Sequence, residues 1–364
     1  MTGSTARPSP ASTSGPLRFA RTVVGLGIGA LMLAACGGGE SEGSSSSESD
    51  GGLQEVTFLN ILPIESLSFA PELVASTCGH FEDQGLDVKF EATQGSAPAI
   101  QTIIAGSALL TRVGDIETIL AAGDKKAPLV NVGTVTKRGP IRMVSSSDDP
   151  IETAADFRGK MVGTPSEGGT SSITLDLVAS SAGIDPSEVD RQVVGLTPAV
   201  FDLVTSGRID AYIVSLDIAV LLDQQEEKAV VYDPSDDIKS GAQLYMTSTE
   251  QADDPEKQDQ IRRYLAGIES AINFMIEDEA NGFEETMKCI SSEYDVPALA
   301  DKEVAKESLS GYVKSWTAAG EGTIAKTDTE QWDATYHEMV DAGLIEDGLD
   351  PNDWLNDDMA PGTS

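Results

Sequence analysis

Apolar and polar residues alternate along most of this chain in a pattern that predicts strands separated by helices. Residues 55–61 (EVTFLNI) and 86–91 (LDVKFE) have the pattern of strands, and helical spacing connects them from Pro71 to about Gly85. Apolar residues recur every three or four positions from Ile261 to Met275, and residues 253–342 are predicted to be helical. Strands that alternate with helices favour an α/β architecture with a mostly parallel sheet.

One structural unit is predicted to occur twice. Each copy reads as a strand, a turn of small residues, a helix, a glycine, a second strand and then Asp-Ile-x-x-apolar-Leu. The turn of the first copy is Gly95-Ser96 and its last motif spans residues 115–120. The turn of the second copy is residues 168–171 and its last motif spans residues 217–222. Two such α/β units would place these turns at the carboxyl ends of their strands, where open sheets bind ligands.

The chain is predicted to cross twice between two lobes. Residues 137–145 leave the first lobe and residues 230–247 return to it, which makes a two-strand hinge of the kind used for closure around a ligand. The expected lobe limits are residues 53–137 plus 247–364 for lobe 1 and residues 138–246 for lobe 2. The helical segment would pack on lobe 1, and the acidic residues 350–364 are expected to form a loose tail.

The first fifty residues have the pattern of an export signal followed by a tether. The apolar run from Val23 to Ala35 would rise about 20 Å as a helix, too short for a bilayer core of about 30 Å. We therefore expect residues 1–35 to be a signal peptide. Residues 33–36 (LAAC) resemble a bacterial lipobox, which would place a lipid on the Cys36 thiol. Alternatively, Cys36 is an incidental core thiol behind an ordinary signal. Residues 36–52 would then be the lipidated cysteine and a flexible tether, because residues 37–52 contain no apolar side chain.

Composition excludes several functions. The 364 residues include 24 Lys plus Arg and 60 Asp plus Glu, a formal net charge of −36. Such a charge would repel nucleic acid and anionic lipid headgroups. Three Cys and two His leave little material for a metal or iron–sulfur site, and no cofactor is expected. Cys78 and Cys289 could form a disulfide or remain two buried thiols, and the sequence does not decide between these.

Several short stretches occur together in one order and resemble a known family. These stretches are residues 79–88, Gly95-Ser96, residues 151–163, residues 168–170, residues 183–189 and residues 206–211. Over about residues 53–247 they resemble the solute-binding proteins of ABC importers for nitrate, sulfonates, taurine and thiamine-pyrimidine precursors. One departure is Gly106-Ser107-Ala108-Leu109, where that family usually has Gly-x-Ala-Asp.

The resemblance implies a periplasmic-binding-protein-like fold, with two α/β lobes joined by a two-strand hinge and a C-terminal helical segment packed on the first lobe. From the predicted signal and lipobox we expect the protein on the extracytoplasmic face of the cell membrane, attached only through its lipid, and we expect it to be a monomer. Such a protein would bind a small solute between its lobes and deliver it to ABC permease and ATPase subunits.

The candidate ligand-binding residues lie in the turns after the strands. Gly and Ser at helix starts expose N–H donors, although Ser and Thr also cap helices in ordinary structure. Phe69 could stack on a planar ligand, or it could belong to the core. The full candidate set is Ile64, Glu65, Phe69, Gly95, Ser96, Gly114, Asp115, Gly168, Gly169, Thr170, Ser215 and Asp217.

Charge near these turns bears on the solute. The acids are Glu65, Asp115, Glu117, Glu167 and Asp217, and the nearby cations are Arg112, Lys137 and Arg138. Carboxylates disfavour a buried anion and accept hydrogen bonds from N–H groups, so a neutral or amine-bearing pyrimidine-like solute is favoured. Arg112 is the main objection. Arg112 would favour an anionic solute if its side chain entered the cleft. Alternatively, Arg112 forms a salt bridge to a nearby acid and is not available to the solute.

Three alternatives remain open from the sequence. The protein could bind a sulfonate, taurine or nitrate anion, or it could be a secreted lipid-anchored enzyme. His80 and His337 lie in no recognisable nucleophile motif and lack metal-ligand spacing, so we expect no enzyme. A sensor or adhesin would have a similar cleft without a permease partner.

Overall fold

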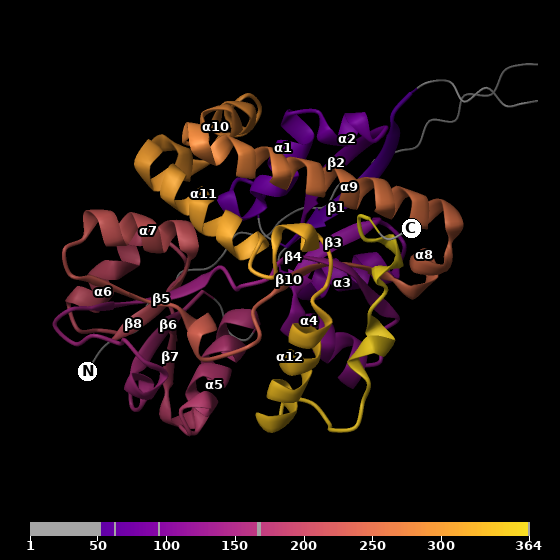
Figure 1. Cartoon of the computed structure of the whole chain (residues 1–364). Helices are drawn as coiled ribbons and strands as arrows, with labels where there is room; N and C mark the ends of the chain where they lie inside the picture. Colours follow the sequence, from indigo (N-terminus) through magenta and orange to yellow (C-terminus); the bar gives the residue numbers. More distant parts are fainter. Residues whose placement is uncertain (1–51, 62, 94, 166–168, 363–364) are drawn as a thin grey trace, which may run out of the picture. The chain divides into compact units, whose positions relative to one another are not determined.

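Two five-stranded mixed sheets form the framework of the protein (Figure 1). The computed structural model describes residues 52–61, 63–93, 95–165 and 169–362. Gly168, Glu167, the predicted signal, Cys36 and almost all of the tether lie outside the described residues. The first sheet has the order β2 (Leu86–Ala92), β1 (Gln54–Asn60), β3 (Leu110–Gly114), β10 (Gln243–Ser248), β4 (Leu129–Thr136). The second has the order β7 (Asp190–Val193), β6 (Met161–Thr164), β8 (Ala211–Ser215), β5 (Ile141–Ser146), β9 (Ala229–Tyr232).

Both sheets combine parallel and antiparallel pairs in the same way. β1 is parallel to β2 and β3, and β6 is parallel to β7 and β8. β10 is antiparallel to β3 and β4, and β5 is antiparallel to β8 and β9. Every residue of β3 and β4 is buried, as expected for strands covered on both faces. The predicted two-lobed α/β fold is confirmed, but the expectation of a mostly parallel sheet is wrong, because each sheet has two parallel and two antiparallel strand pairs.

Helices follow the strands and then dominate the C-terminal part. The helices up to the last strand are α1 (Ala70–Thr77), α2 (His80–Asp83), α3 (Ser96–Ile104), α4 (Asp115–Ile119), α5 (Thr170–Ser181), α6 (Phe201–Thr205) and α7 (Leu216–Gln225). The later ones are α8 (Thr249–Asp253), α9 (Pro255–Asp278), α10 (Glu284–Ser291), α11 (Lys302–Trp316) and α12 (Thr329–Asp341). Within the described ranges, no helix combines the length and apolarity needed to cross a membrane.

The predicted helix from Pro71 to Gly85 is wrong in one respect, because it is broken into α1 and α2. Gly79 has φ of 84°, in the left-handed region, and separates the two helices. Glycine adopts this conformation without the steric cost that a side chain brings, so it ends α1 and starts a new direction.

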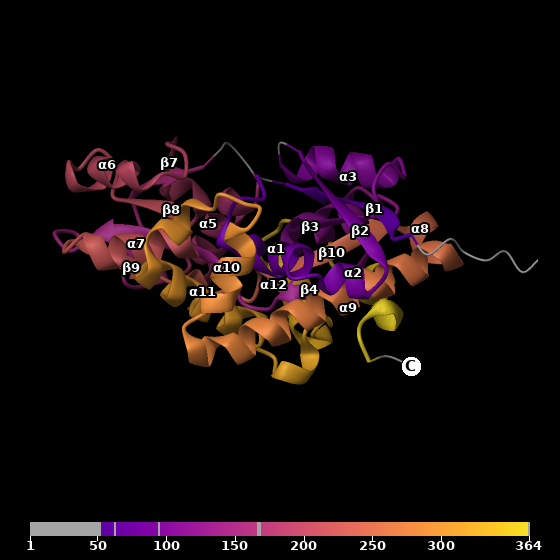
Figure 2. The same cartoon turned by 90° about the horizontal axis from the view of Figure 1, so that it is seen from above.

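The long helix α9 contains the residues that were predicted to be helical from their apolar spacing. Asp254 caps its start by accepting from the N–H groups of Glu256 and Lys257. Its apolar face, which includes Ile261 and Leu265, is buried in the same core as Phe58 of β1. Figure 2 shows α9 running along the side of the first sheet, next to α1 and α2. The predicted C-terminal helical segment on lobe 1 is confirmed.

The hinge consists of two short crossings between the sheets. The chain passes from β4 to β5 through residues 137–140 and returns from β9 to β10 through residues 233–242. The crossings touch at two glycines, since a Cβ on Gly139 would lie 3.1 Å from the carbonyl oxygen of Gly241. β10 begins at Gln243, before the predicted return at residue 247. The lobe limits of 53–137 plus 247–364 and 138–246 therefore stay a prediction.

The helical segment also contacts the second lobe. On α11, a Cβ at Gly311 would lie 2.8 Å from Leu216 of α7, so a glycine is needed for this approach. The next residue, Tyr312, donates a hydrogen bond from its hydroxyl to Asp217 Oδ1 at 3.3 Å. Figure 1 shows α11 lying beside α7. The C-terminal helices thus span both lobes.

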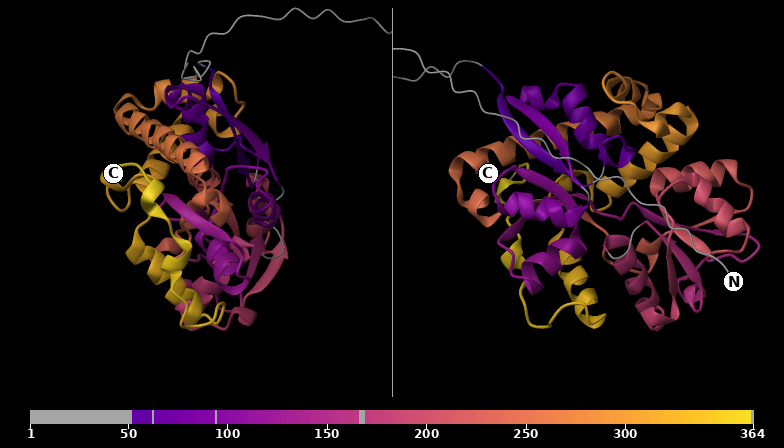
Figure 3. Two further views of the ribbon diagram at one scale, coloured as in Figure 1. Left: turned by 90° about the vertical axis from the view of Figure 1, so that its right-hand side faces the viewer. Right: turned by 180° about the vertical axis from the view of Figure 1, so that it is seen from behind.

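The prediction of a loose tail is wrong for the described residues of 350–362. Trp332 Nε1 donates to the Pro351 carbonyl at 2.9 Å, and the Asn356 N–H donates to the Asn131 carbonyl of β4 at 2.8 Å. Met359 is only 1% exposed. These contacts cover the edge of the first sheet, and Figure 3 shows the yellow C-terminal segment running along this part of the molecule. The prediction failed because it relied on the acidic composition of the segment and gave no weight to the few apolar residues that anchor it.

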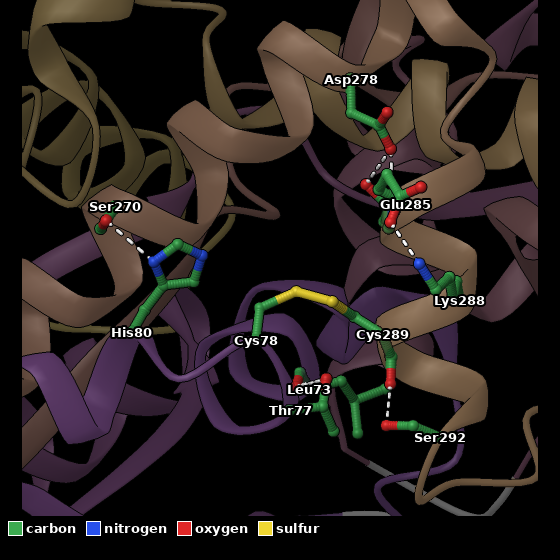
Figure 4. Close-up of a disulfide and its surroundings, with 11 residues drawn as sticks. Leu73, Thr77, Cys78, His80, Ser270, Asp278, Glu285, Lys288, Cys289 and Ser292 are labelled. Atoms are coloured by element: carbon green, nitrogen blue, oxygen red, sulfur yellow. Dashed lines mark hydrogen bonds and ion pairs between the residues drawn. A yellow bond between two sulfur atoms is a disulfide. The ribbon is translucent and has the colours of Figure 1, made fainter.

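Cys78 and Cys289 are joined by a disulfide and are not two separate buried thiols. The bond links the end of α1 to α10, with a Cα–Cα distance of 5.7 Å (Figure 4). It closes a sequence separation of 211 residues, which includes the whole of lobe 2.

Removal of this disulfide should destabilise the protein. A crosslink over so long a loop restricts the unfolded chain, and its loss typically costs about 2–5 kcal/mol. Urea unfolding of the Cys78→Ala/Cys289→Ala double variant should show that loss. Addition of a reductant should lower the free energy of unfolding of the wild type and leave that of the double variant unchanged. Free thiols titrating in the native, unreduced wild type at these positions would contradict the bond.

Candidate ligand-binding site

Segments from both sheets meet at the carboxylate of Glu117. Ser96, the first residue of α3, donates from its hydroxyl to Glu117 Oε1 at 3.3 Å. Thr170, the first residue of α5, donates from its hydroxyl to the same oxygen. α3 and α4 accompany the first sheet and α5 accompanies the second, so this contact joins the lobes. Two predicted site residues, Ser96 and Thr170, are thereby brought together.

Glycines shape the turns that deliver these two hydroxyls. Gly95 precedes α3 with φ of 97°, and its N–H donates to the Ile61 carbonyl at 2.9 Å. Gly169 precedes α5 with φ of 77°. Positive φ favours glycine at both places, and each turn leads into a helix whose first N–H groups have no intrahelical acceptor. Such helix starts can bind polar or anionic ligand atoms.

Gly114 allows the Glu117 carboxylate to fold back toward its own helix start. A Cβ on Gly114 would lie 2.4 Å from Glu117 Oε2 and 3.5 Å from the Thr170 methyl group. Glu117 Oε2 is buried and has no hydrogen-bond partner among the described residues. The site therefore contains one satisfied and one unsatisfied carboxylate oxygen.

Asp115 was expected to contact the ligand, but the structure places it in the hinge. Its carboxylate is 1% exposed and accepts from the N–H groups of Gly241 at 3.0 Å and Ala242 at 3.0 Å. It also accepts from the N–H of Ile116 at 2.8 Å. Burial raises the pKa of Asp115 to about 7, with these N–H bonds opposing the rise. Sequence reasoning missed this role, because Gly241 is distant along the chain.

Arg112 is held in a buried ion pair and is not a free cation. Its Nη1 lies 2.9 and 3.0 Å from the two oxygens of Glu72, and its Nη2 donates to the Ser68 carbonyl at 2.7 Å. Tyr245 donates to Glu72 Oε1 at 2.8 Å. The guanidinium carbon lies 4.3 Å from the centre of the Phe69 ring. Arg112 therefore forms the salt bridge that was one of its two alternatives.

Phe69 and Ile64 belong to the core rather than to an open surface. Phe69 is 3% exposed and its ring packs against Arg112, so it lies in the core, the second of its two alternatives, and its contact with a ligand stays a prediction. Ile64 is 8% exposed in the same cluster. Glu65 is exposed, and Ser215 is the N-cap residue of α7. Asp217 accepts from Tyr312, a partner that the sequence did not indicate.

His80 and Lys137 are both engaged in hydrogen bonds within the chain. Within the described ranges, no cluster of His, Cys, Asp and Glu has the arrangement of a metal site. His80 Nδ1 lies 3.0 Å from the Ser270 hydroxyl on α9, and burial lowers the pKa of His80. Lys137 donates to the carbonyls of Thr134 and Lys326, and burial lowers its pKa to about 7. A cavity of about 300 Å³ lies elsewhere on lobe 1, between Gly123 and Trp354.

Sequence reasoning counted Glu117 among the acids near the turns but did not select it as a site residue. Its position three residues after Gly114, at a strand end that the repeat had marked, was the available signal. What the sequence could not show is that Ser96 and Thr170 converge on its carboxylate.

The fold and these turns define a two-lobed α/β protein in which helix starts from both lobes meet at one carboxylate. The chain belongs to the NMT1/THI5-like family, whose model matches residues 66–281. It is 24% identical over 317 residues to the riboflavin-binding protein RibY of Chloroflexus aurantiacus, covering 86% of this chain and 88% of that protein. It is 29% identical over 141 residues to the 4-amino-5-hydroxymethyl-2-methylpyrimidine phosphate synthase of Legionella pneumophila, covering 38% and 43%.

Solved structures share the fold. The aliphatic sulphonate-binding protein SsuA of Escherichia coli matches with a TM-score of 0.62 and 16% identity, covering 84% of this chain and 98% of SsuA. The nitrate-binding protein NrtA of Synechocystis PCC 6803 matches with a TM-score of 0.59 and 14% identity, covering 84% and 87%. The resemblance inferred from the sequence is confirmed at the level of family and fold.

Loss of Arg112 should be much more costly than loss of an exposed arginine. Arg112→Met leaves the buried Glu72 carboxylate without its cation, which typically costs about 3–5 kcal/mol. Arg158→Met is the matched control, because the Arg158–Glu188 pair is exposed and worth less than about 1 kcal/mol. Urea unfolding measures both. Equal, small effects would contradict the buried pair.

Asp115 should make stability depend on pH. Its pKa of about 7 in the folded chain exceeds the ordinary value of 3.8, so the folded state holds this proton more tightly between those values. The free energy of unfolding should therefore fall as pH rises from about 4 to 7, by up to about 1.4 kcal/mol per pH unit.

Asp115→Asn should lack that decline, since an amide does not ionise. Asp210→Asn is the matched control, because Asp210 also accepts a backbone N–H, from Met161 at 2.7 Å. Urea unfolding at several pH values gives the comparison. A slope for Asp115→Asn equal to that of the wild type would contradict the buried, proton-retaining carboxyl.

Proposed function

We propose that this protein is an extracytoplasmic solute-binding lipoprotein of an ABC importer. It captures a small nitrogenous, pyrimidine-like solute between its lobes and delivers it unaltered to a permease. The observation that carries this proposal is the contact of Ser96, Glu117 and Thr170, which joins turns from both sheets at one carboxylate. A solute held at this place would contact both lobes and so favour their closure.

The charges near the junction support a neutral or amine-bearing solute over an anion. Arg112, the cation that could have received an anion, is paired with Glu72 in the core. Glu117 remains at the junction as a hydrogen-bond acceptor. A buried anion beside a carboxylate is costly, whereas an N–H group is matched by it.

The names of two relatives agree with this choice of solute. RibY is named for riboflavin, and the Legionella enzyme is named for an aminopyrimidine phosphate. Both compounds contain nitrogen heterocycles with N–H groups. SsuA and NrtA, named for sulphonate and nitrate, supply the competing proposal of an anion.

The location follows from the predicted N-terminal segment. Cys36 would carry the lipid and residues 37–52 the tether, so that the body beginning near residue 53 works beside the cell membrane. The solute would pass to ABC permease and ATPase subunits, with the binding protein acting as a monomer.

We propose a binding role rather than a catalytic one, although one relative is named as a synthase. Neither histidine has the surroundings of a catalytic base at the junction. His80 is engaged with Ser270 on α9, and His337 is exposed on α12 beside Asp333. A sensor or adhesin would need the same binding step without a transporter.

Calorimetric titration of the full-length chain in detergent tests the solute class. The probes are 4-amino-5-hydroxymethyl-2-methylpyrimidine, riboflavin, an alkanesulfonate and nitrate. We expect a Kd of micromolar or tighter, about −8 kcal/mol, for one of the two nitrogenous probes and no heat from the two anions.

Tight binding of sulfonate or nitrate alone would contradict the proposal of a nitrogenous solute and favour an anionic one. Mass spectrometry of the released solute completes the test. An unchanged mass supports binding without conversion, and a converted product would mean that the protein is an enzyme.

A further inference from the structure

The two oxygens of the Glu117 carboxylate are in different states. Oε1 accepts from Ser96, on its own lobe, and from Thr170, on the other lobe. Oε2 is buried and accepts no hydrogen bond from any described residue. A carboxylate has about four acceptor sites, so Glu117 retains capacity for a donor from outside the chain. Leaving such a buried atom unsatisfied is unfavourable, and a hydrogen bond from a ligand N–H would remove that penalty.

The surroundings hold this carboxylate in place without neutralising it. Gly114 provides the space for Oε2, since a Cβ there would come within 2.4 Å of it. Among the described residues, no Lys or Arg forms an ion pair with Glu117, and Arg112 is occupied by Glu72. The neighbouring Asp115 is committed to the N–H groups of the hinge. The unsatisfied oxygen is thus presented beside a contact between the lobes.

We propose that Glu117 determines the specificity of the site by accepting a hydrogen bond at Oε2 from an amino or ring N–H group of the solute. The solute class is a nitrogen heterocycle that carries such a donor, either neutral or cationic. This inference rests on the proposed function and adds the residue that distinguishes donors from anions. Because Oε1 also contacts Thr170, occupancy of the same carboxylate links solute recognition to the contact between the lobes.

The test compares two probes that differ only in the donor. They are 4-amino-5-hydroxymethyl-2-methylpyrimidine and the analogue with hydrogen in place of its 4-amino group. The full-length wild type, Glu117→Gln, and the matched control Glu250→Gln, which alters an exposed residue of α8, are titrated with both. Glu117→Gln should weaken the aminopyrimidine about tenfold or more, because a charge-assisted bond is lost, and leave the analogue within about twofold. Glu250→Gln should match the wild type.

Several outcomes separate this inference from the proposed function. If Glu117→Gln binds both probes as the wild type does, or weakens both equally, the role of Glu117 is overturned while solute binding stands. If the wild type binds neither pyrimidine probe, this inference is overturned, and the proposed function still stands if riboflavin binds in the earlier titration. If only the alkanesulfonate or nitrate binds there, the proposed function fails as well. Unfolding midpoints of all variants check folding. If Glu117→Gln does not fold, Glu117→Asp takes its place, and it should show the same selective loss because its carboxylate is one methylene shorter.

Discussion

The passage between the two sheets depends on one buried carboxylate. Three backbone N–H groups, those of Ile116, Gly241 and Ala242, donate to Asp115, and the Asp115 N–H donates in return to the Ala242 carbonyl at 3.0 Å. These bonds compensate for burying the acid and attach the second crossing to the start of α4. Glu117 lies on the same short helix. The hinge and the residue at the lobe junction are therefore held by one piece of backbone.

The distribution of charge gives the junction its chemistry. The chain has far more acids than bases, yet the cations nearest to the strand ends are used in structure. Arg112 neutralises Glu72 within the core, and Lys137 donates to two carbonyls at the first crossing. Arg138 and Arg142 pair with Asp233 at the second crossing. What remains at the junction is a carboxylate with an unused oxygen, which suits a donor rather than an anion.

The C-terminal helices connect the lobes as well as covering the first sheet. Lys137 donates its backbone N–H to the Ser315 carbonyl of α11 at 3.0 Å, and Glu338 of α12 accepts from the N–H groups of Lys239 and Ser240. Both crossings are thus bonded to helices that follow them by many residues. Closure of the lobes around a solute would have to adjust these contacts together with the hinge.

Local patterns in the sequence determined much of the architecture. The strands near residues 55–61 and 86–91, the helical spacing of α9 and the repeated strand–turn–helix unit depend on side-chain periodicity and on Gly and Ser at turns, which are short-range properties. The same patterns located Ser96 and Thr170 at helix starts. The ordered motifs also identified the family.

Only the tertiary structure decided how those segments meet. Several contacts depend on residues far apart in the chain. They are the Cys78–Cys289 disulfide, the Arg112–Glu72 ion pair, the bonds of Asp115 to the hinge and the packing of Phe69 in the core. The break at Gly79 and the anchoring of residues 351–360 likewise depend on what packs against them. The physical reason is that a side chain's partner is set by the packing of distant elements, and one sequence encodes that packing only through the complete fold.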